Sequence, residues 1–357
     1  MKALSILHRW SGGFIGLLLA ILGLSGTILV WEGQWVSLPG AGDPLAEQVQ
    51  VIGMIAEREA AAGATRITFA SEEIGLHHVV RAGGEGSYVK QDGTVVASWS
   101  SQWERPELWI FDLHHHLFAG ETGETVSGIA GIAGLLFVVT GTTLWWRSRR
   151  SFKFRLLPRA FQPGPIVSYH RDIGIMVAPL LLVTFLTGTG MIFEDAAKLA
   201  LSPFGKLERL AKLPVAAPAQ GSVPLAAMLA DAKARFPQAE LRRVTMPMNP
   251  RQPWGVRMRQ PFEWTPNGRT NLYFDGNGKL LRVDDPAGGS RANWINEKLY
   301  PIHSGKAGGL PWKLTMTLSG LGLTLLGSLG AWSFWFRRVR KRKRPEIASA
   351  GLEVAAA

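Results

Sequence analysis

The sequence predicts an integral membrane protein, mainly α-helical, with four transmembrane helices in two parallel repeats. Each repeat carries a small α+β domain on the outer side of the membrane. Three observations predict this class: four long uncharged apolar segments, basic residues clustered after two of them, and a set of residues that recurs at the same spacing in both halves of the chain.

Four segments are long enough to cross the hydrocarbon core of a bilayer, which takes about 20 apolar residues. None of them carries a charge between its ends, and much of the 46% hydrophobic content of this 357-residue chain lies in them. A buried helix of a soluble protein rarely needs so long an uncharged run. The predicted spans are Ser11–Trp31, Ser127–Trp146, Ile173–Phe193 and Leu314–Phe336.

Basic residues cluster after the second and the fourth spans, which marks those ends as cytoplasmic. The first cluster is Arg147, Arg149, Arg150, Lys153, Arg155 and Arg159, and the second is Arg337, Arg338, Arg340, Lys341, Arg342, Lys343 and Arg344. Both termini and the middle loop are therefore expected in the cytoplasm of a bacterium, and the two long connectors in its periplasm. The first span resembles a signal peptide, but it is long and no cleavage site follows it, which favours an uncleaved helix.

This topology divides the chain into eight parts in the inner membrane. They are residues 1–31 (transmembrane helix), 32–126 (periplasmic domain), 127–146 (helix), 147–172 (cytoplasmic loop), 173–193 (helix), 194–313 (periplasmic domain), 314–336 (helix) and 337–357 (basic cytoplasmic tail).

The charge and the missing cysteines exclude several classes of function. The formal net charge of +12 is concentrated at the span ends, which indicates contact with anionic lipid and no nucleic-acid partner. With no cysteine in the sequence, disulfides, iron–sulfur clusters, thiolate-ligated haem and covalently attached haem are excluded.

The two halves of the chain repeat a pattern without gaps. His8-Arg9 precedes the first span as His170-Arg171 precedes the third, and each His is followed by Gly at +4 and +18 and by Glu at +24. His114 and His303 are each followed by Gly at +27 and Trp at +32. The repeated positions are Gly12/Gly174, Gly26/Gly188, Glu32/Glu194, Gly141/Gly330 and Trp146/Trp335. Copies that each cross the membrane twice have the same orientation, which predicts a pseudo-twofold axis along the membrane normal.

Each long connector has the pattern of a small α+β domain. The first combines a helix over Pro44–Ala62 with extended runs at Arg66–Ala70, His77–Arg81 and Tyr88–Ser98, and Gln91-Asp92-Gly93 is expected as the hairpin turn that joins the last two runs. The second combines a helix over Pro224–Phe236 with extended runs at Leu241–Met246, Gly255–Arg259, Asn271–Phe274 and Lys279–Asp284. The last two runs are joined by the hairpin signal Asp275–Gly278.

Four of the eight histidines occupy repeat-related places. His8 and His170 lie at the cytoplasmic ends of the first and third spans, and His114 and His303 lie just outside the second and fourth. Across a pseudo-twofold axis each pair faces itself, and two opposed imidazoles can supply both axial ligands of a haem iron. We therefore expect two b-type haems, held by His8 with His170 and by His114 with His303.

Other interpretations of these residues stay open. A single His at a span end often contacts lipid headgroups, and His115 or His116 could ligate in place of His114. A structural zinc ion is a weaker hypothesis, because no cluster of four ligands is evident near either pair. His77 and His78 are expected to be ordinary surface residues. Glycines on the first two spans could form grooves for a flat macrocycle or could simply let helices pack closely; they are Gly12, Gly16, Gly23, Gly26, Gly128, Gly131, Gly134 and Gly141.

The motifs at the span ends resemble those of the PepSY-associated transmembrane family. They are His8-Arg9-Trp10-Ser11-Gly12, Leu113–Gly120, Leu144-Trp145-Trp146-Arg147, Ile302-His303-Ser304-Gly305 and Trp335-Phe336-Arg337. The resemblance implies PepSY-like outer domains, haem ligation by His8, His170, His114 and His303, and a periplasmic ferric siderophore as substrate. The family often has Arg at the position of His115, so this chain departs from the family pattern there.

The histidine pairs predict a transmembrane electron path, and the family resemblance implies that the chain is an inner-membrane reductase that passes electrons to Fe(III) in a ferric siderophore and releases Fe(II). No flavin or nicotinamide motif is found, so the electron donor is expected to be a membrane quinol or a separate cytoplasmic partner. One alternative is a haem-free scaffold whose outer domains bind a peptide, a protease or a metal ion. A second alternative is a haem electron-transfer protein with a different periplasmic acceptor.

No side chain in the sequence identifies the substrate contacts. Six of the tryptophans and four of the arginines in the outer segments are candidates, but in most proteins such residues form cores, interfaces or solvated strand faces. These residues are Trp99, Trp103, Trp109, Trp254, Trp264, Trp294, Arg242, Arg243, Arg257 and Arg259. No catalytic side chain is expected, since outer-sphere electron transfer requires none.

Overall fold

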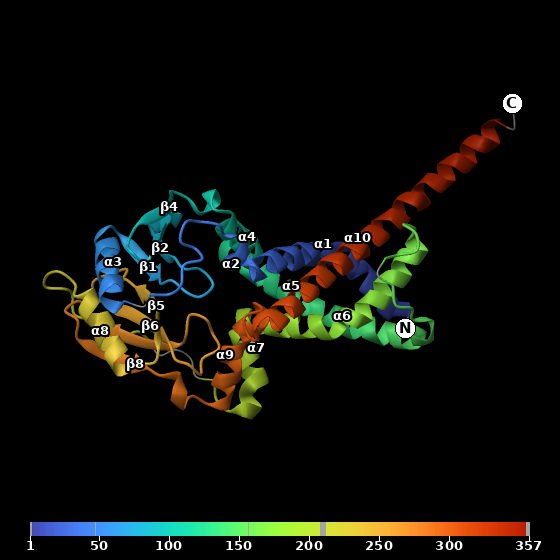
Figure 1. Cartoon of the computed structure of the whole chain (residues 1–357). Helices are drawn as coiled ribbons and strands as arrows, with labels where there is room; N and C mark the ends of the chain where they lie inside the picture. The colour runs from blue at the N-terminus through green and yellow to red at the C-terminus, as the bar shows by residue number, and fades with distance from the viewer. Residues whose placement is uncertain (1, 47, 156, 208–211, 355–357) are drawn as a thin grey trace. The chain divides into compact units, whose positions relative to one another are not determined.

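The chain forms two compact units, which are described separately (Figure 1). The helical unit comprises Met1–Val30, Phe111–Phe193 and His303–Ala357, and the sheet unit comprises Trp31–Ile110 and Glu194–Ile302. This computed structural model describes residues 2–46, 48–155, 157–207 and 212–354, with side chains up to Phe336.

Four long helices build the helical unit, and all four predicted spans are confirmed as long and apolar enough to cross a membrane. They are α1 (Lys2–Val30), α5 (Gly120–Ser148), α6 (Pro163–Ile192) and α10 (Gly309–Val354). The helices extend beyond the predicted spans, so that His8 and His170 lie inside α1 and α6 and do not precede them. The protein is therefore a multi-pass, mainly helical membrane protein.

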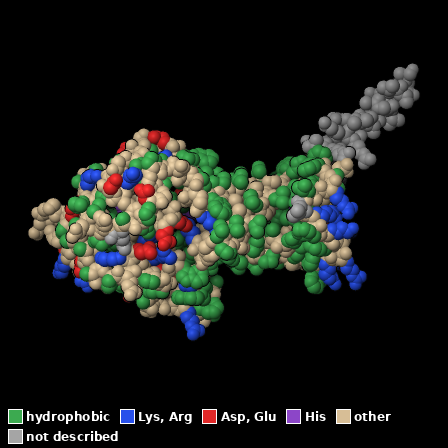
Figure 2. Space-filling model, viewed as in Figure 1, with side chains coloured by type: hydrophobic (Ala, Val, Ile, Leu, Met, Phe, Trp, Pro, Cys, Tyr) green, Lys and Arg blue, Asp and Glu red, His purple; other side chains and the backbone are tan. Residues whose placement is uncertain are grey.

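The surface of the helical unit is apolar, as contact with the interior of a bilayer requires. Large apolar side chains are exposed on every long helix, among them Phe14, Leu136, Leu186 and Leu318. Such continuous apolar exposure is unusual for a soluble protein and suits contact with lipid. Figure 2 shows hydrophobic side chains covering the sides of the unit and Lys and Arg side chains gathered at one end. The second predicted basic cluster, Arg337–Arg344, lies outside the residues whose side chains are described.

Glycines bring α1 and α10 into close contact along their length. A Cβ atom on Gly16 would lie 2.8 Å from the carbonyl oxygen of Gly327, and one on Gly23 would lie 2.7 Å from that of Gly320. One turn before Gly16 on α1, the carbonyl of Gly13 accepts a hydrogen bond from Trp335 Nε1 of α10 over 3.0 Å. In lipid no hydrophobic effect drives helices together, so close backbone packing of this kind supplies much of their association.

The sheet unit is built on eight antiparallel strands in the order β4-β3-β2-β1-β5-β6-β7-β8. The first half of the chain supplies β1 (Ala64–Thr68), β2 (His77–Arg81), β3 (Gly86–Val89) and β4 (Val95–Trp99). The second half supplies β5 (Glu240–Thr245), β6 (Trp254–Arg259), β7 (Thr270–Phe274) and β8 (Leu280–Asp284).

The two outer segments, expected as separate domains, share this one sheet. Strands β1 and β5 pair at its centre, with Ile67 opposite Val244. Helices α3 (Val49–Ala61) and α8 (Leu225–Arg235) pack against each other, and one core includes residues of both segments. The predicted run Tyr88–Ser98 is two strands, β3 and β4, because the Gln91-Asp92-Gly93 turn falls inside it.

Four shorter helices connect these elements: α2 (Glu32–Trp35), α4 (Pro106–His116), α7 (Glu194–Leu201) and α9 (Arg291–His303). The turn after α4 holds Leu117 and Phe118 at φ 48° and 62°, a region that residues other than glycine seldom adopt. The turn after α9 uses Gly305 at φ 80° for a similar purpose. Both turns leave a histidine, His114 or His303, close to the start of a long helix.

His77 is a core residue, and its prediction as a surface residue is wrong. His77 lies two residues before Val79 on β2, so both side chains point to the same face of the sheet. That face is the core, and the His77 side chain is only 1% exposed. Its Nδ1 accepts a hydrogen bond from the Ala70 amide over 3.0 Å. Burial lowers the pKa of His77 from 6.5 to about 4, which keeps the ring neutral at pH 7.

Acid is therefore expected to loosen the sheet unit. The unfolded chain takes up a proton near pH 6.5 and the folded chain only near pH 4, so stability present above pH 6.5 is lost as the pH falls through that window. The loss amounts to about 3 kcal/mol for a shift of this size. Hydrogen exchange at β1 and β2, corrected for its intrinsic pH dependence, should lose protection between pH 7 and pH 5. Burial also lowers the pKa of His78, the next residue on β2, to about 4, so His77→Gln, which removes one of the two titrating rings, should remove about half of the loss. An unchanged loss in this variant would contradict the assignment.

Candidate functional site

The structure brings the four repeat-related histidines together as two pairs, both in the helical unit. The ring centroids of His8 and His170 lie 6.5 Å apart, and those of His114 and His303 lie 6.2 Å apart. Each pair joins one histidine from the first half of the chain to one from the second. The pairing is the one expected from the repeat.

The two pairs lie near opposite ends of the helical unit. His8 is in the second turn of α1, whereas His114 packs against Gly26, where a Cβ atom would lie 2.8 Å from the His114 ring. Eighteen residues of helix separate His8 from Gly26, which corresponds to about 27 Å at 1.5 Å per residue. Gly188 on α6 accepts the His303 ring at the same distance of 2.8 Å. One pair therefore lies toward each face of a bilayer about 30 Å thick.

Hydrogen bonds fix the orientation of the His114 and His303 rings. His303 Nδ1 lies 3.1 Å from the Thr184 carbonyl oxygen, which can only accept, so Nδ1 carries the proton. Thr187 Oγ1 lies 3.2 Å from the same nitrogen. Ser25 Oγ lies 3.0 Å from His114 Nδ1 and donates its own proton to the Ile21 carbonyl over 2.8 Å. Both rings thus carry the proton on Nδ1 and leave Nε2 unprotonated, which is the form that binds a metal.

In the pair formed by His8 and His170, the two rings have different hydrogen-bond partners. His8 Nδ1 lies 2.8 Å from Thr140 Oγ1, and Thr140 donates its proton to the Leu136 carbonyl over 2.7 Å. His8 is therefore also the Nδ1–H tautomer. Leu329 stands at the position that corresponds to Thr140 in the second repeat, and His170 Nδ1 is buried without a hydrogen-bond partner in the part of the chain that the structure describes.

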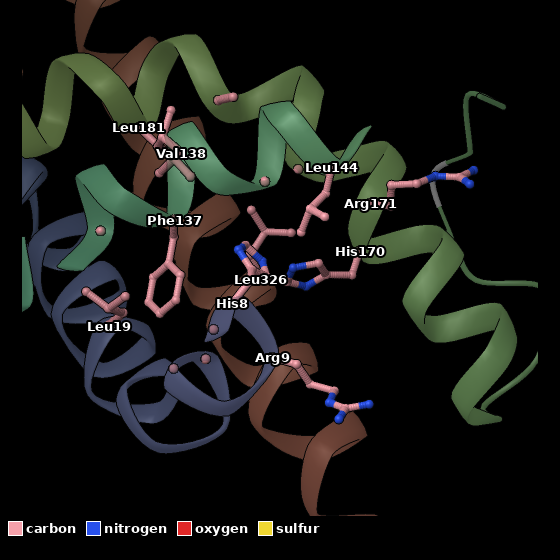
Figure 3. Close-up of a pocket in the computed structure, with 18 of the residues that line it drawn as sticks. His8, Arg9, Leu19, Phe137, Val138, Leu144, His170, Arg171, Leu181 and Leu326 are labelled. Atoms are coloured by element: carbon pink, nitrogen blue, oxygen red, sulfur yellow. The ribbon is translucent and has the colours of Figure 1, made fainter. Parts of the chain in front are cut away.

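A cavity of about 390 Å³ adjoins His8 and His170. Figure 3 shows the two rings pointing toward one another, with Phe137, Leu144 and Leu326 among the apolar side chains around them. Arg9 and Arg171 lie at the rim and point away from the rings, and Arg171 is paired with Asp172. The volume lies within the range of small-molecule and cofactor sites, and the lining is mainly apolar, as such sites are.

The eight glycines proposed as a groove divide into three groups. A Cβ atom on Gly12 would have nothing within 4 Å, and one on Gly141 would have only the His8 ring at 3.4 Å, so these two glycines leave open space beside the histidines. Gly26 makes room for the His114 ring. The others contact a neighbouring helix, as close helix packing predicts: Gly16 and Gly23 contact α10, and Gly128, Gly131 and Gly134 contact residues 185–193 at the end of α6.

The three consecutive histidines, His114, His115 and His116, make different contacts. His115 stacks on Phe111 with ring centroids 4.4 Å apart and an angle of 16° between the planes. His116 Nδ1 bonds Asp112 Oδ1 over 2.9 Å. His114 is left as the member that faces His303.

The spacing within each pair suits a metal held from two opposite sides. An imidazole nitrogen lies about 2 Å from a bound first-row metal and its ring centre about 1 Å farther, so two opposed rings are about 6 Å apart. Both observed separations agree with this value. Among the described residues, no group of three or more His, Cys, Asp or Glu is placed to hold a metal ion. A planar cofactor that supplies the remaining ligands fits the donors present.

The hydroxyl groups that hold the rings were not among the residues expected from the sequence. Ser25 and Thr187 both lie 17 residues after the histidine that opens their repeat, so the repeat itself contains the signal. A single Ser or Thr inside a span commonly has a different role, such as a hydrogen bond to its own helix backbone. Only the folded contact with Nδ1 of a histidine from another helix distinguishes these two.

Comparison with known proteins agrees with the architecture. The family model described as the PepSY-associated TM region matches residues 5–338. No curated protein matches the chain.

Proposed function

The chain belongs to the PepSY-associated transmembrane family, and we propose that it is a dihaem reductase of the bacterial inner membrane that delivers electrons to Fe(III) in a periplasmic ferric siderophore. The observation that carries this proposal is the spacing of the two histidine pairs, 6.5 Å and 6.2 Å between ring centroids. The termini would lie in the cytoplasm and the sheet unit in the periplasm.

The residues present would hold two b-type haems. His8 and His170 would hold one haem toward one face of the membrane, and His114 and His303 would hold the other toward the opposite face. When bound, a haem supplies reversible one-electron chemistry at its iron, with a potential set by axial ligands, burial and hydrogen bonding. Apolar side chains around His8 and His170 would exclude water, and the open space at Gly12 and Gly141 would admit a flat ring.

The hydroxyl groups would keep each ring in its metal-binding tautomer. Ser25 receives the Nδ1–H of His114, and Thr140 receives that of His8, so neither ring needs to reorient or lose a proton when it binds a metal. His170 lacks such a hydroxyl among the described residues. The two pairs would therefore differ in potential, as a directional electron path requires.

Reduction would release the metal from its carrier. Siderophores bind Fe(III) through hard oxygen donors, and Fe(II), with its lower charge, is held far less tightly. One electron gained by the iron is balanced by one lost from the reduced protein, and the donor that restores it would be a membrane quinol or a cytoplasmic partner. No proton or covalent step is needed from the protein.

Ser25→Ala is expected to weaken cofactor retention without loss of folding. Removal of an outer partner of a metal-bound His typically costs 10- to 100-fold in affinity, so we expect faster haem loss by about tenfold and a shifted potential at one haem only. Redox titration and transfer of haem to apomyoglobin would measure both effects. Ser168→Ala, which removes an exposed hydroxyl of α6, is the matched control. Equal effects of the two substitutions would contradict the role of Ser25.

The acceptor is tested by stopped-flow reoxidation of the reduced protein. Ferric siderophore should reoxidise the haems faster than equimolar cupric complex or an oxidised periplasmic electron carrier. Equal rates with all acceptors would favour the second candidate, a general transmembrane electron-transfer protein. A colourless protein would favour the haem-free scaffold and would contradict the reductase.

A further inference from the structure

The two faces of the central sheet differ in chemistry. Ile67, Val244, Val256 and Leu272 on four adjacent strands are fully buried in the core. Because side chains alternate along a strand, the neighbouring positions point to the opposite face. This second face carries Arg66 on β1, Arg243 on β5 and Arg257 on β6, and we call these three residues the arginine row.

The arginine row places like charges against each other. Arg243 and Arg257 are direct cross-strand partners, and Arg66 lies diagonally from Arg243, opposite Thr245. Like charges directly opposite each other destabilise a sheet. The side chain of Arg257 is held in place, because its Nε donates a hydrogen bond to Asn271 Oδ1 over 2.9 Å.

Carboxylates neutralise the arginines on both sides of the row but not the row itself. Arg105 pairs with Glu107 over 2.7 Å, and Arg282 pairs with Asp284 over 2.8 Å. Arg242 and Arg259, which flank the row along their strands, both reach Glu240. Within the described residues no carboxylate forms an ion pair with Arg66, Arg243 or Arg257.

The arginine row is partly accessible. Arg66 is exposed, and Arg243 and Arg257 are half-buried. Arg243 Nε is buried without a hydrogen-bond partner among the described residues. Burial, together with the charges of Arg257 and Arg66, lowers the pKa of Arg243 from 12.5 to about 10, so the guanidinium stays charged at pH 7.

We propose that the arginine row is a binding site for an anionic, oxygen-rich ferric chelate of the tris-catecholate or polycarboxylate class, in preference to neutral hydroxamate chelates. Guanidinium groups bind carboxylate and phenolate oxygens through paired charge-assisted hydrogen bonds. An anion between Arg243 and Arg257 would remove the repulsion between their charges. The inference rests on the proposed function for the identity of the metal, while the anion preference follows from the row alone.

The test uses gallium(III) chelates, which resemble the ferric complexes but are not reduced. Calorimetry on the full-length protein in neutral detergent would compare a trianionic gallium tris-catecholate with a neutral gallium tris-hydroxamate. The anionic chelate should bind at least about tenfold more tightly, and Arg257→Gln or Arg243→Gln should each weaken it by about tenfold or more. Neither variant should alter binding of the neutral chelate more than about twofold.

Arg235→Ala is the matched control, since Arg235 lies on α8 and pairs with Asp231 over 2.9 Å. It should leave binding unchanged. Without ligand, Arg243→Gln should raise the thermal midpoint because a like-charge contact is removed. A lowered midpoint would assign Arg243 a structural role and overturn the proposal.

Other outcomes separate this inference from the proposed function. Equal binding of both chelates by a haem-containing protein would overturn the anion preference alone. Selective binding by a protein without haem would support the arginine row and contradict the reductase. Displacement of the chelate by an equal concentration of inorganic phosphate would indicate a simple anion site and overturn the chelate class.

Discussion

Replacement of His303 by alanine is expected to lower the haem content of the purified protein from two per chain to one. His303 supplies one of the two rings of its pair, and the centroid separation of 6.2 Å leaves His114 alone on the other side. A haem held by one axial ligand loses its low-spin spectrum and is bound far less tightly. Pyridine haemochrome assays and protein determination would give the ratio. His170→Ala should remove the other haem, and the double variant should remove both.

His115→Ala is the control for this experiment. Its ring is adjacent in sequence to His114 but stacks on Phe111, 4.4 Å away, and so should not ligate. Two haems per chain are expected in this variant. If His115→Ala loses a haem while His114→Ala retains both, the assignment within the triplet is wrong.

Replacement of Gly327 by valine is expected to prevent stable assembly of the helical unit. The Cβ of Gly327 would overlap the carbonyl oxygen of Gly16 and lie 3.0 Å from the backbone nitrogen of Ala20, and backbone cannot move aside as a side chain can. Overpacking typically costs 1–3 kcal/mol, so with a rigid neighbour we expect a loss of about 3 kcal/mol or more. The readouts are the yield of monodisperse protein in detergent and its thermal midpoint.

Gly164→Ala is the matched control for this substitution. Gly164 lies in the first turn of α6, and nothing stands within 4 Å of its Cβ position. Its yield and midpoint should equal those of the unmodified protein. A normal yield for Gly327→Val would show that α1 and α10 do not depend on close backbone contact.

Much of the architecture follows from the sequence, because its determinants are local. The four spans are visible as uncharged apolar runs, and the offsets from His8 and His170 reveal the repeat without any structure. The same offsets predict which histidines meet. The turn at Asp275–Gly278 also falls between β7 and β8, where its residues place it.

What the sequence does not reveal depends on contacts between distant segments. The pairing of β1 with β5 joins residues far apart in the chain, and no local pattern specifies it. The opposition of Arg243 and Arg257 depends on a shift of register between Leu241 and Arg243. A one-residue change in such a register would move a side chain to the other face of the sheet. The roles of Ser25 and Thr187 likewise appear only when another helix brings a histidine to them.

The most direct test of the central claim is the absorption spectrum of the unmodified protein, purified in detergent from cells with ample haem. Two b-type haems per chain are expected, both low-spin in the oxidised and the dithionite-reduced states. A colourless protein would contradict the dihaem assignment. So would one haem per chain in the unmodified protein that neither His170→Ala nor His303→Ala removes.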